Sequence, residues 1–257
     1  MGVEKGKHMD PTASISQIFS GIQGEGPRVG RKSLFLRFRG CNWNCRYCDT
    51  DRSRNGPAFI ERSPGQRCFE SSPNPWSSKE VAKVLRALNS VGPGHSDLAV
   101  TGGEPLLYDV FLKELFEVWP NTERSHLSLL LETNGTLPEG MEETGELWDV
   151  VSMDIKLESA TGLTTPWELH RLFLEGMRRI QETIVKLVVV PETPQKELAQ
   201  AADLILGSSL KDPQIVIQPA WGVLFPPGKL LEMLDLFLEK GWAARIIPQI
   251  HKILGDL

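Results

Sequence analysis

The stretch from Cys41 to Cys48 holds the residue types in this chain best suited to chemistry. Cys41, Cys45 and Cys48 are separated by three and two residues, so one loop can aim three thiolates at one inorganic centre. Cysteine thiolates hold iron–sulfur clusters, and a four-iron cluster held by only three of them keeps one iron open for another ligand. The spacing therefore predicts a cluster with an open iron.

A structural zinc site is the alternative interpretation of the same loop. Such a site normally takes four protein ligands. No histidine lies near the loop, so only Cys68 could complete an all-cysteine set. A zinc-stabilised binding module without catalysis therefore stays open as an alternative. A disulfide framework fits less well, because four cysteines in 257 residues are far from the cysteine-dense pattern of small secreted domains.

The elements that position this loop follow from the alternation of apolar residues and from turn signals. A strand at Ser33–Arg39 delivers the chain to Gly40 and the cysteine loop, and a shorter strand at Ile15–Phe19 precedes a glycine-rich loop. Further strands are expected at Asp97–Thr101, Leu127–Glu132, Val150–Ile155, Ile184–Val190, Ile215–Pro219 and Ala244–Ile247. Helices are expected between them, at about Ser78–Leu88, Asp109–Trp119, Pro166–Glu182, Pro194–Leu206 and Pro227–Lys240.

This alternation of strands and long helices predicts an α/β fold with a mostly parallel sheet. We count about six of these strands in the repeating strand–helix pattern, fewer than the eight of a closed barrel, which indicates a partial (β/α)6-type TIM barrel. In barrels of this kind the active site lies at the carboxyl ends of the strands. We therefore expect the cysteine loop, Gly102–Pro105, Thr133–Asn134 and Gln218 to converge there.

Composition and length predict one soluble globular domain over residues 1–257, with 40% hydrophobic and 24% charged residues. Residues 1–10 are expected to be disordered or a cloning remnant, and residues 51–77 to form a loop-rich insertion that contains Cys68. The formal charge of −5 offers no basic field for nucleic acid. No apolar run reaches the roughly 20 residues that span a bilayer, and we recognise no signal peptide. Reduced cysteines then indicate a cytoplasmic location.

Two motifs together resemble the radical S-adenosylmethionine (SAM) superfamily. They are the cysteine loop, with Tyr47 just before its last cysteine, and Gly102-Gly103-Glu104-Pro105, which alone would be read as a turn. The resemblance implies a 4Fe-4S cluster on Cys41, Cys45 and Cys48 with SAM on the open iron. It implies SAM contacts from Tyr47, Gly102, Gly103, Glu104, Asn134, Ser152 and Gln218. Core or turn roles are the structural alternative for Tyr47, Asn134 and Ser152.

Further segments extend the resemblance to the 7-carboxy-7-deazaguanine synthase family over most of the chain. They are Gln23–Pro27, Phe35–Gly40, Cys48–Thr50, Thr101–Pro105, Glu132–Gly135, Gln218–Pro219 and Pro248–Lys252. The resemblance implies that a reduced cluster cleaves SAM and that the resulting 5′-deoxyadenosyl radical takes a hydrogen from 6-carboxy-5,6,7,8-tetrahydropterin. Ring contraction and loss of ammonia then give 7-carboxy-7-deazaguanine, in queuosine and deazapurine biosynthesis.

The same resemblance implies the remaining site residues and partners. Thr50 would bind Mg2+, and substrate contacts would come from Gln23, Glu25, Gly26, Arg37, Thr101, Gln249 and His251. Catalysis would need no side chain beyond the cofactor. A homodimer and a flavodoxin-like electron donor are expected, without nucleic acid or membrane. The segment Ser152–Lys156, however, resembles glycyl-radical enzyme activating enzymes, which are the alternative function.

Overall fold

The structure of this 257-residue protein is a computed structural model that describes residues 10–48, 50 and 53–255. The expectation for residues 1–10 therefore lies outside the described residues, except for Asp10, whose carboxylate pairs with Lys79 at 2.9 Å. In the part of the chain that is described, no helix is long and apolar enough to cross a membrane.

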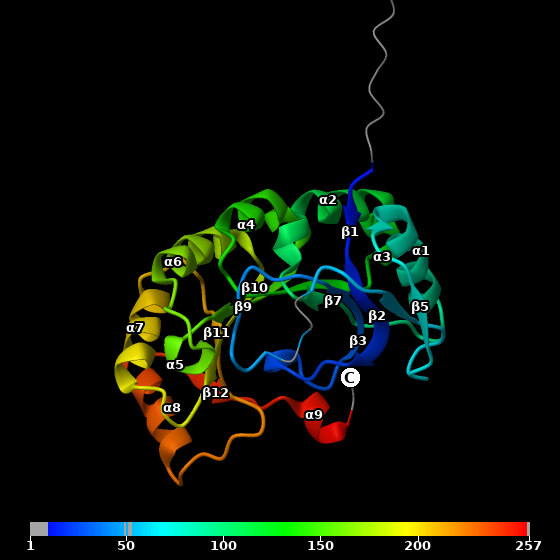
Figure 1. Cartoon of the computed structure of the whole chain (residues 1–257). Coiled ribbons are helices and arrows are strands. Elements are labelled where there is room, and N and C mark those ends of the chain that lie inside the picture. Colours follow the sequence, from blue (N-terminus) through cyan, green and yellow to red (C-terminus); the bar gives the residue numbers. More distant parts are fainter. Residues whose placement is uncertain (1–9, 49, 51–52, 256–257) are drawn as a thin grey trace, which may run out of the picture.

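A curved ten-stranded sheet organises the molecule, in the order β12-β11-β10-β9-β8-β7-β3-β2-β4-β5 (Figure 1). Its parallel part consists of β3 (Lys32–Phe38), β7 (Asp97–Gly102), β8 (Ser128–Thr133), β9 (Val150–Ile155), β10 (Glu182–Val189), β11 (Gln214–Pro219) and β12 (Ala244–Ile246). Before it, β2 (Ile15–Ile22) runs antiparallel to β3. The predicted partial barrel with a mostly parallel sheet is confirmed, and in the described residues β12 and β5 are the two edges of the sheet.

Helices form an arc outside this sheet (Figure 1). The long ones are α1 (Ser78–Asn89), α2 (Asp109–Val118), α6 (Trp167–Gly176), α7 (Gln195–Leu206) and α8 (Lys229–Glu239), and the short ones α3 (Asn121–Arg124), α4 (Pro138–Thr144), α5 (Glu158–Thr161) and α9 (Ile250–Leu254). A capping box begins α1, in which Ser77 and Glu80 satisfy each other's backbone N–H groups. The apolar faces of these helices and the outer face of the sheet form the main hydrophobic core.

The inner face of the sheet has an apolar floor below a polar layer. Seven strands each contribute one buried residue to the floor, which contains Phe19, Phe35, Ala99, Leu130, Val150, Ile184 and Val216. Because side chains on a strand alternate between its two faces, the residues two positions further along β3, β7, β8, β10 and β11 face the same way. These residues are Arg37, Thr101, Glu132, Lys186 and Gln218. The fold thus arranges polar side chains from five strands above a hydrophobic base.

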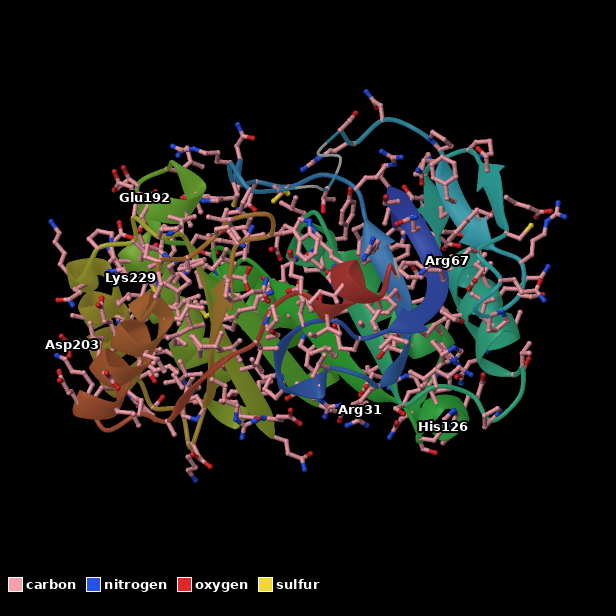
Figure 2. All side chains as sticks on the ribbon, turned by 90° about the horizontal axis from the view of Figure 1, so that it is seen from below. Arg31, Arg67, His126, Glu192, Asp203 and Lys229 are labelled. Carbon is pink, nitrogen blue, oxygen red and sulfur yellow. The ribbon has the colours of Figure 1, made fainter. Side chains whose placement is uncertain are left out.

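A buried ionic network closes the opposite end of the sheet, where the parallel strands begin. Arg28 follows β2 and forms an ion pair with Asp97 at the start of β7, and its guanidinium also contacts Glu182 of β10 at 2.7 Å. Arg31 adds a second cation to Asp97 at 2.9 Å. Figure 2 labels Arg31 and His126 along this edge of the molecule. The loop between β2 and β3 is therefore tied to strands far from it in sequence.

Two expectations differ from the structure. Residues 53–77 are not an irregular excursion, because they contain β4 (Ala58–Glu61), β5 (Phe69–Ser72) and β6 (Trp76–Ser77). The hairpin of β4 and β5 extends the main sheet beside β2, and β6 pairs with β1 (Thr12–Ala13). The helix expected at Pro166–Glu182 ends at Gly176, because Glu182 instead begins β10 and pairs with Arg28.

Replacing Arg28 by Ala should lower the free energy of unfolding by about 3 kcal/mol, because it leaves the buried Asp97 with one partly exposed cation. Urea unfolding followed by circular dichroism measures this loss. Arg171→Ala is the matched control, since the ion pairs of Arg171 with Glu168 and Glu175 are exposed and contribute little. Equal losses in the two variants would contradict a buried network at this end.

Candidate functional site

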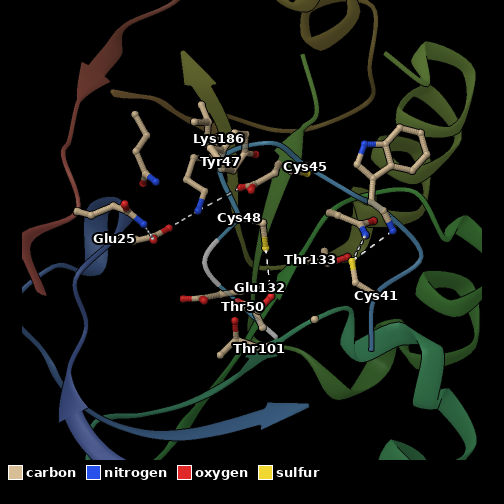
Figure 3. A pocket seen from close by; sticks show the side chains of 18 of the residues that line it. Glu25, Cys41, Cys45, Tyr47, Cys48, Thr50, Thr101, Glu132, Thr133 and Lys186 are labelled. Carbon is tan, nitrogen blue, oxygen red and sulfur yellow. Dashed lines mark hydrogen bonds and ion pairs between the residues drawn. The ribbon is translucent and has the colours of Figure 1, made fainter. Parts of the chain in front are cut away.

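A cavity of about 460 Å³ opens at the carboxyl ends of the parallel strands (Figure 3). Fourteen of the residues expected at a site line it, namely Glu25, Arg37, Cys41, Cys45, Tyr47, Cys48, Thr50, Thr101, Gly102, Gly103, Asn134, Gln218, Gln249 and His251. Gln23, Gly26, Glu104 and Ser152 do not line it. The cysteine loop therefore meets Gly102, Gly103, Thr133, Asn134 and Gln218 as predicted, whereas Glu104 and Pro105 of the same prediction do not line the cavity.

The cysteine loop is held against the end of β7 by a main-chain contact that only glycine permits. A Cβ atom at Gly103 would lie 1.8 Å from the carbonyl oxygen of Gly40, and Gly102 has φ +121°. The amide of Gly103 donates to the Phe38 carbonyl at 3.0 Å, and that of Glu104 donates to the Gly40 carbonyl at 2.9 Å. Glycines therefore let the two motifs meet through their backbones.

Glu104 is fully buried beneath this contact and fixes the next strand end. Its carboxylate accepts hydrogen bonds from the Leu106 amide at 3.1 Å, the Thr133 hydroxyl at 2.8 Å and the Asn134 amide at 2.8 Å. Burial raises the pKa of Glu104 to about 7 despite these donors. Glu104 thus supports the cavity from behind its wall, tying β7 to the end of β8.

A chain of buried charged groups crosses the cavity from the cysteine loop to the C-terminal helix. Lys156 Nζ lies 3.1 Å from the Tyr47 hydroxyl and 2.6 Å from Asp154 Oδ2. Asp154 Oδ1 lies 3.2 Å from Lys186 Nζ, which also pairs with Glu25. Gln249 donates to the second oxygen of Glu25 at 2.6 Å. The two ends of the cavity are therefore electrostatically connected.

The ion pairs in this row of side chains keep Glu25, Lys156 and Lys186 charged. Burial opposes ionisation of Glu25, but the adjacent Lys186 outweighs it and lowers the pKa of Glu25 to about 2. Burial likewise opposes the charge on Lys156 and Lys186, yet the Asp154 carboxylate raises the pKa of both. Burial, and then the charge of Glu25, raise the pKa of Glu132, which borders the same space.

One segment near the N-terminus and one near the C-terminus of the polypeptide together form one wall of the cavity. The amide of Ile250 donates to the Gly24 carbonyl at 2.9 Å, and a Cβ at Gly24 would lie 2.0 Å from His251 Nδ1. The missing side chain at Gly24 therefore makes room for α9. Gln23 lies behind this wall, where its Nε2 donates to Glu132 at 2.9 Å and its Oε1 accepts from the Glu25 amide at 3.1 Å.

The guanidinium of Arg37 stacks on two aromatic rings. Its guanidinium carbon lies 4.9 Å from the ring centre of Phe19 and 5.9 Å from that of Phe35, an arrangement that favours the cation. Its Nη1 also donates to Gln17 at 3.2 Å. The planar guanidinium therefore stands on the apolar floor and lines the cavity with donors suited to a carboxylate.

Sequence reasoning missed three functional candidates and left two more undecided. The missed residues Gln17, Glu132 and Asp154 line the cavity. Lys156 and Lys186 line it as well, although the sequence alone allows each to be either a polar contact at a strand end or a surface lysine. A signal was present, because Glu132, Asp154 and Lys186 interrupt strands that are otherwise buried on both faces. The remaining expected residues take structural positions, with Gly26 in a tight 3-10 turn at φ +63° and Ser152 buried on β9.

The chemistry of these residues fits a cluster and a polar cofactor. The thiols of Cys41, Cys45 and Cys48 line the same cavity, whereas Cys68 is exposed and outside it. Within the described residues, no three His, Cys, Asp or Glu side chains form a site for a single metal ion. The side-chain oxygen of Gln218 is buried at the cavity without a hydrogen-bond partner among those residues. A buried acceptor of this kind requires a donor, such as an amino or hydroxyl group of a ligand.

Comparisons with known proteins agree with this geometry. Residues 35–205 match the family described as the Radical SAM superfamily. The chain is 37% identical to the 7-carboxy-7-deazaguanine synthase of Geobacter sulfurreducens, covering 96% of this chain and 99% of that protein. It is 35% identical to the synthase of the same name from Methanothermobacter thermautotrophicus, covering 95% and 97%. The fold is similar to the crystal structure of QueE from Escherichia coli, with a TM-score of 0.56, 18% identity and coverage of 91% and 93%.

His170 should make the folded protein sensitive to acid. It is fully buried, with Nδ1 3.0 Å from the Gly135 carbonyl and Nε2 accepting from the Lys156 amide at 2.9 Å. Burial lowers the pKa of His170 to about 4, so the fold favours the neutral ring and loses stability as the pH falls from 6.5 toward 4. We expect His170 to account for about 2 kcal/mol of lost unfolding free energy between pH 7.5 and 5.

The measurement is urea unfolding of wild-type protein and of His170→Gln at both pH values. Because His95 is also buried and its pKa is lowered to about 4, it contributes the same loss to both proteins, and only the difference reports on His170. Identical pH dependence in the two proteins would contradict a buried neutral His170.

Proposed function

The chain belongs to the radical SAM superfamily and, within it, to the family of 7-carboxy-7-deazaguanine synthases, and we propose that it acts as that carbon–nitrogen lyase. The reaction converts 6-carboxy-5,6,7,8-tetrahydropterin into 7-carboxy-7-deazaguanine with loss of ammonia, in deazapurine and queuosine biosynthesis. Superfamily membership implies a 4Fe-4S cluster and SAM. The observation that carries the proposal is one cavity that joins the cysteine loop to Glu25, Arg37 and Gln249.

In this proposal Cys41, Cys45 and Cys48 hold the cluster, and the adjacent half of the cavity holds SAM. Cluster and SAM together supply the radical that removes a hydrogen atom from the substrate. Contacts with SAM come from Tyr47, Gly102, Gly103, Asn134 and Gln218, and Glu104 and Ser152 act from behind the wall. The buried acceptor of Gln218 supports this assignment, since it needs a donor from the ligand.

The other half of the cavity holds the pterin. Glu25, ionised beside Lys186, accepts hydrogen bonds from the 2-aminopyrimidine edge. Arg37 pairs with the substrate carboxylate, and its aromatic support keeps the guanidinium in place. Thr101, Gln249 and His251 complete the walls, while Gln23 and Gly26 hold the loop that carries Glu25. These residues bind, orient and exclude water, which is the protein's part in cofactor chemistry.

Magnesium is proposed at Thr50, which lines the cavity next to Cys48. Protein ligation of Mg2+ is typically sparse, so one hydroxyl together with substrate oxygens and water is a reasonable set. The metal would then orient the substrate carboxylate between Thr50 and Arg37. Omission of Mg2+ should slow turnover without changing the iron content.

Two other functions are alternatives to this proposal, a glycyl-radical enzyme activating enzyme and a zinc-stabilised binding module. The Asp154-Ile155-Lys156 segment resembles glycyl-radical enzyme activating enzymes, but here Asp154 pairs with Lys186 and so belongs to the polar wall that carries Glu25. The zinc-stabilised binding module needs Cys68 as a fourth ligand, and Cys68 is exposed outside the cavity. A small polar ligand fits this wall better than the extended chain of a protein substrate.

The setting of the enzyme is also proposed. We infer a single radical SAM domain over residues 1–257, since one sheet includes strands from Ile15 to Ile246. The cluster cysteines favour a reducing cytoplasm. A flavodoxin-like protein would donate the electron, and two copies would form a homodimer. The net charge of −5 disfavours nucleic acid as a partner.

The function is tested with anaerobically reconstituted, reduced protein given SAM, Mg2+ and 6-carboxytetrahydropterin. Mass spectrometry should find a product lighter than the substrate by the mass of ammonia. Arg37→Ala should raise KM or abolish turnover while SAM still binds, whereas Arg62→Ala, an exposed arginine paired with Glu70, should behave as wild type. Cleavage of SAM only when a glycyl-radical enzyme is added, with no pterin product, would decide for the activating-enzyme alternative.

Cys68→Ser should retain wild-type iron content and SAM cleavage, because Cys68 lies outside the cavity that the other three cysteines line. Cys45→Ser is the matched control and should lose the cluster. Iron analysis and the visible absorption spectrum measure both. Loss of iron in the Cys68 variant would restore the four-cysteine interpretation.

A further inference from the structure

Asn134, Asn42 and Thr136 form a closed ring of hydrogen bonds beside Cys41. Asn134 Nδ2 donates to Asn42 Oδ1 at 2.8 Å, and Asn42 Nδ2 donates to the Thr136 hydroxyl at 2.8 Å. That hydroxyl donates to Asn134 Oδ1 at 2.5 Å. Asn134 Nδ2 also donates to the sulfur of Cys41 at 3.7 Å. The ring joins the cysteine loop to the end of β8.

The orientation of the Asn134 amide follows from its neighbours. The backbone amide of Thr136 lies 2.9 Å from one end of the Asn134 side chain, and a backbone N–H can only donate. That end must therefore be the oxygen. The nitrogen is then the end that faces Cys41 and Asn42, so the contact with the sulfur is N–H···S and not a lone pair against a thiolate.

All the hydrogen-bonding capacity of the Asn134 amide is used in this arrangement. Its two N–H groups serve Cys41 and Asn42, and its oxygen accepts from the amide and the hydroxyl of Thr136. Asn134 as a whole is only 5% exposed. Little capacity is left for side-chain hydrogen bonds to a ligand, so a contact of Asn134 with SAM would be one of packing or of its backbone. The contact through which this side chain can act on the cluster is the one with Cys41.

The donor is held rigidly from its own backbone. The amide of Asn134 donates to the buried Glu104 carboxylate at 2.8 Å, and the carbonyl of the following Gly135 lies 3.0 Å from His170 Nδ1. A second donor reaches the same sulfur, since the amide of Trp43 lies 3.3 Å from it. Cys41 thus accepts two fixed N–H groups, one from its own loop and one from β8.

We propose that Asn134 is a positioning residue that raises the reduction potential of the cluster through its N–H···S hydrogen bond to Cys41, a proposal that rests on the cluster assigned above. Reduction adds negative charge to the cluster and its thiolates. Hydrogen-bond donors to the sulfurs stabilise that charge and thereby favour the reduced state. The residue therefore acts on the ease of reducing the cluster, and the backbone amide of Thr136 keeps the Asn134 donor aimed at Cys41.

The test is the reduction potential of the reconstituted holoenzyme, measured by an anaerobic redox titration followed by electron paramagnetic resonance. Asn134→Ala should lower the equilibrium constant for one-electron reduction by up to about tenfold, which corresponds to about 59 mV. Asn134→Asp should lower it further, because an acceptor replaces the donor while the shape is kept. If the Ala variant loses iron, the isosteric Asp variant supplies the same measurement.

Thr136→Val is the matched control. It removes the hydroxyl from the ring but keeps the Thr136 amide that orients Asn134, so the potential should stay at the wild-type value. An unchanged potential in iron-replete Asn134→Ala and Asn134→Asp would overturn the proposal, and so would an equal fall in Thr136→Val. If the wild type forms the product but the variants keep the wild-type reduction potential, only the role of Asn134 is refuted and the proposed function stands. If the reconstituted wild type shows no four-iron signal, the proposed function itself is refuted.

Discussion

The main-chain contact between Gly103 and Gly40 is the constraint on which the rest of the site depends. A single added Cβ would place carbon 1.8 Å from a carbonyl oxygen, a separation that no small adjustment relieves. The contact lets Glu104 enter the space beneath the loop and accept donors from β8. The positions of the cysteine loop, of β7 and of the Asn134 ring are therefore set by one pair of residues without side chains.

Above the apolar floor, the site solves the problem of burying several charges in one place. Asp154 lies between Lys156 and Lys186, and Lys186 also serves Glu25, so each buried cation has an anionic partner. Burial penalises an isolated charge heavily, and pairing with hydrogen bonds offsets that cost. The low pKa of Glu25 then keeps its acceptors ionised at any physiological pH. The charged wall is therefore held together by contacts within the protein.

Much of this could be predicted from local pattern, and the rest depended on distant partners. Buried parallel strands carry apolar runs that are readable in sequence, and the cysteine spacing indicated a cluster directly. Local pattern could not show that Lys186 meets Glu25 across 161 residues, or that Gln249 meets it across 224. The β4 strand was missed because its surroundings are polar. It ends at Glu61, whose buried carboxylate accepts from the Ser20 and Arg67 amides.

The segment that resembles an activating enzyme, Asp154-Ile155-Lys156, is part of the same network of buried charges. Asp154 and Lys156 share a face of the chain because side chains alternate along β9 and its extension. That face turns Lys156 toward Tyr47 on the cluster side and Asp154 toward Lys186 on the Glu25 side. The Asp154-Ile155-Lys156 segment thus connects the two halves of the cavity, the one beside the cysteine loop and the one beside Glu25. Loss of the Asp154 carboxylate would leave the charge of Lys156 uncompensated and remove one of the ion pairs that hold Lys186. Both halves of the cavity therefore depend on this one carboxylate, a dependence that the cysteine loop and the Asp154-Ile155-Lys156 segment do not show when each is considered alone.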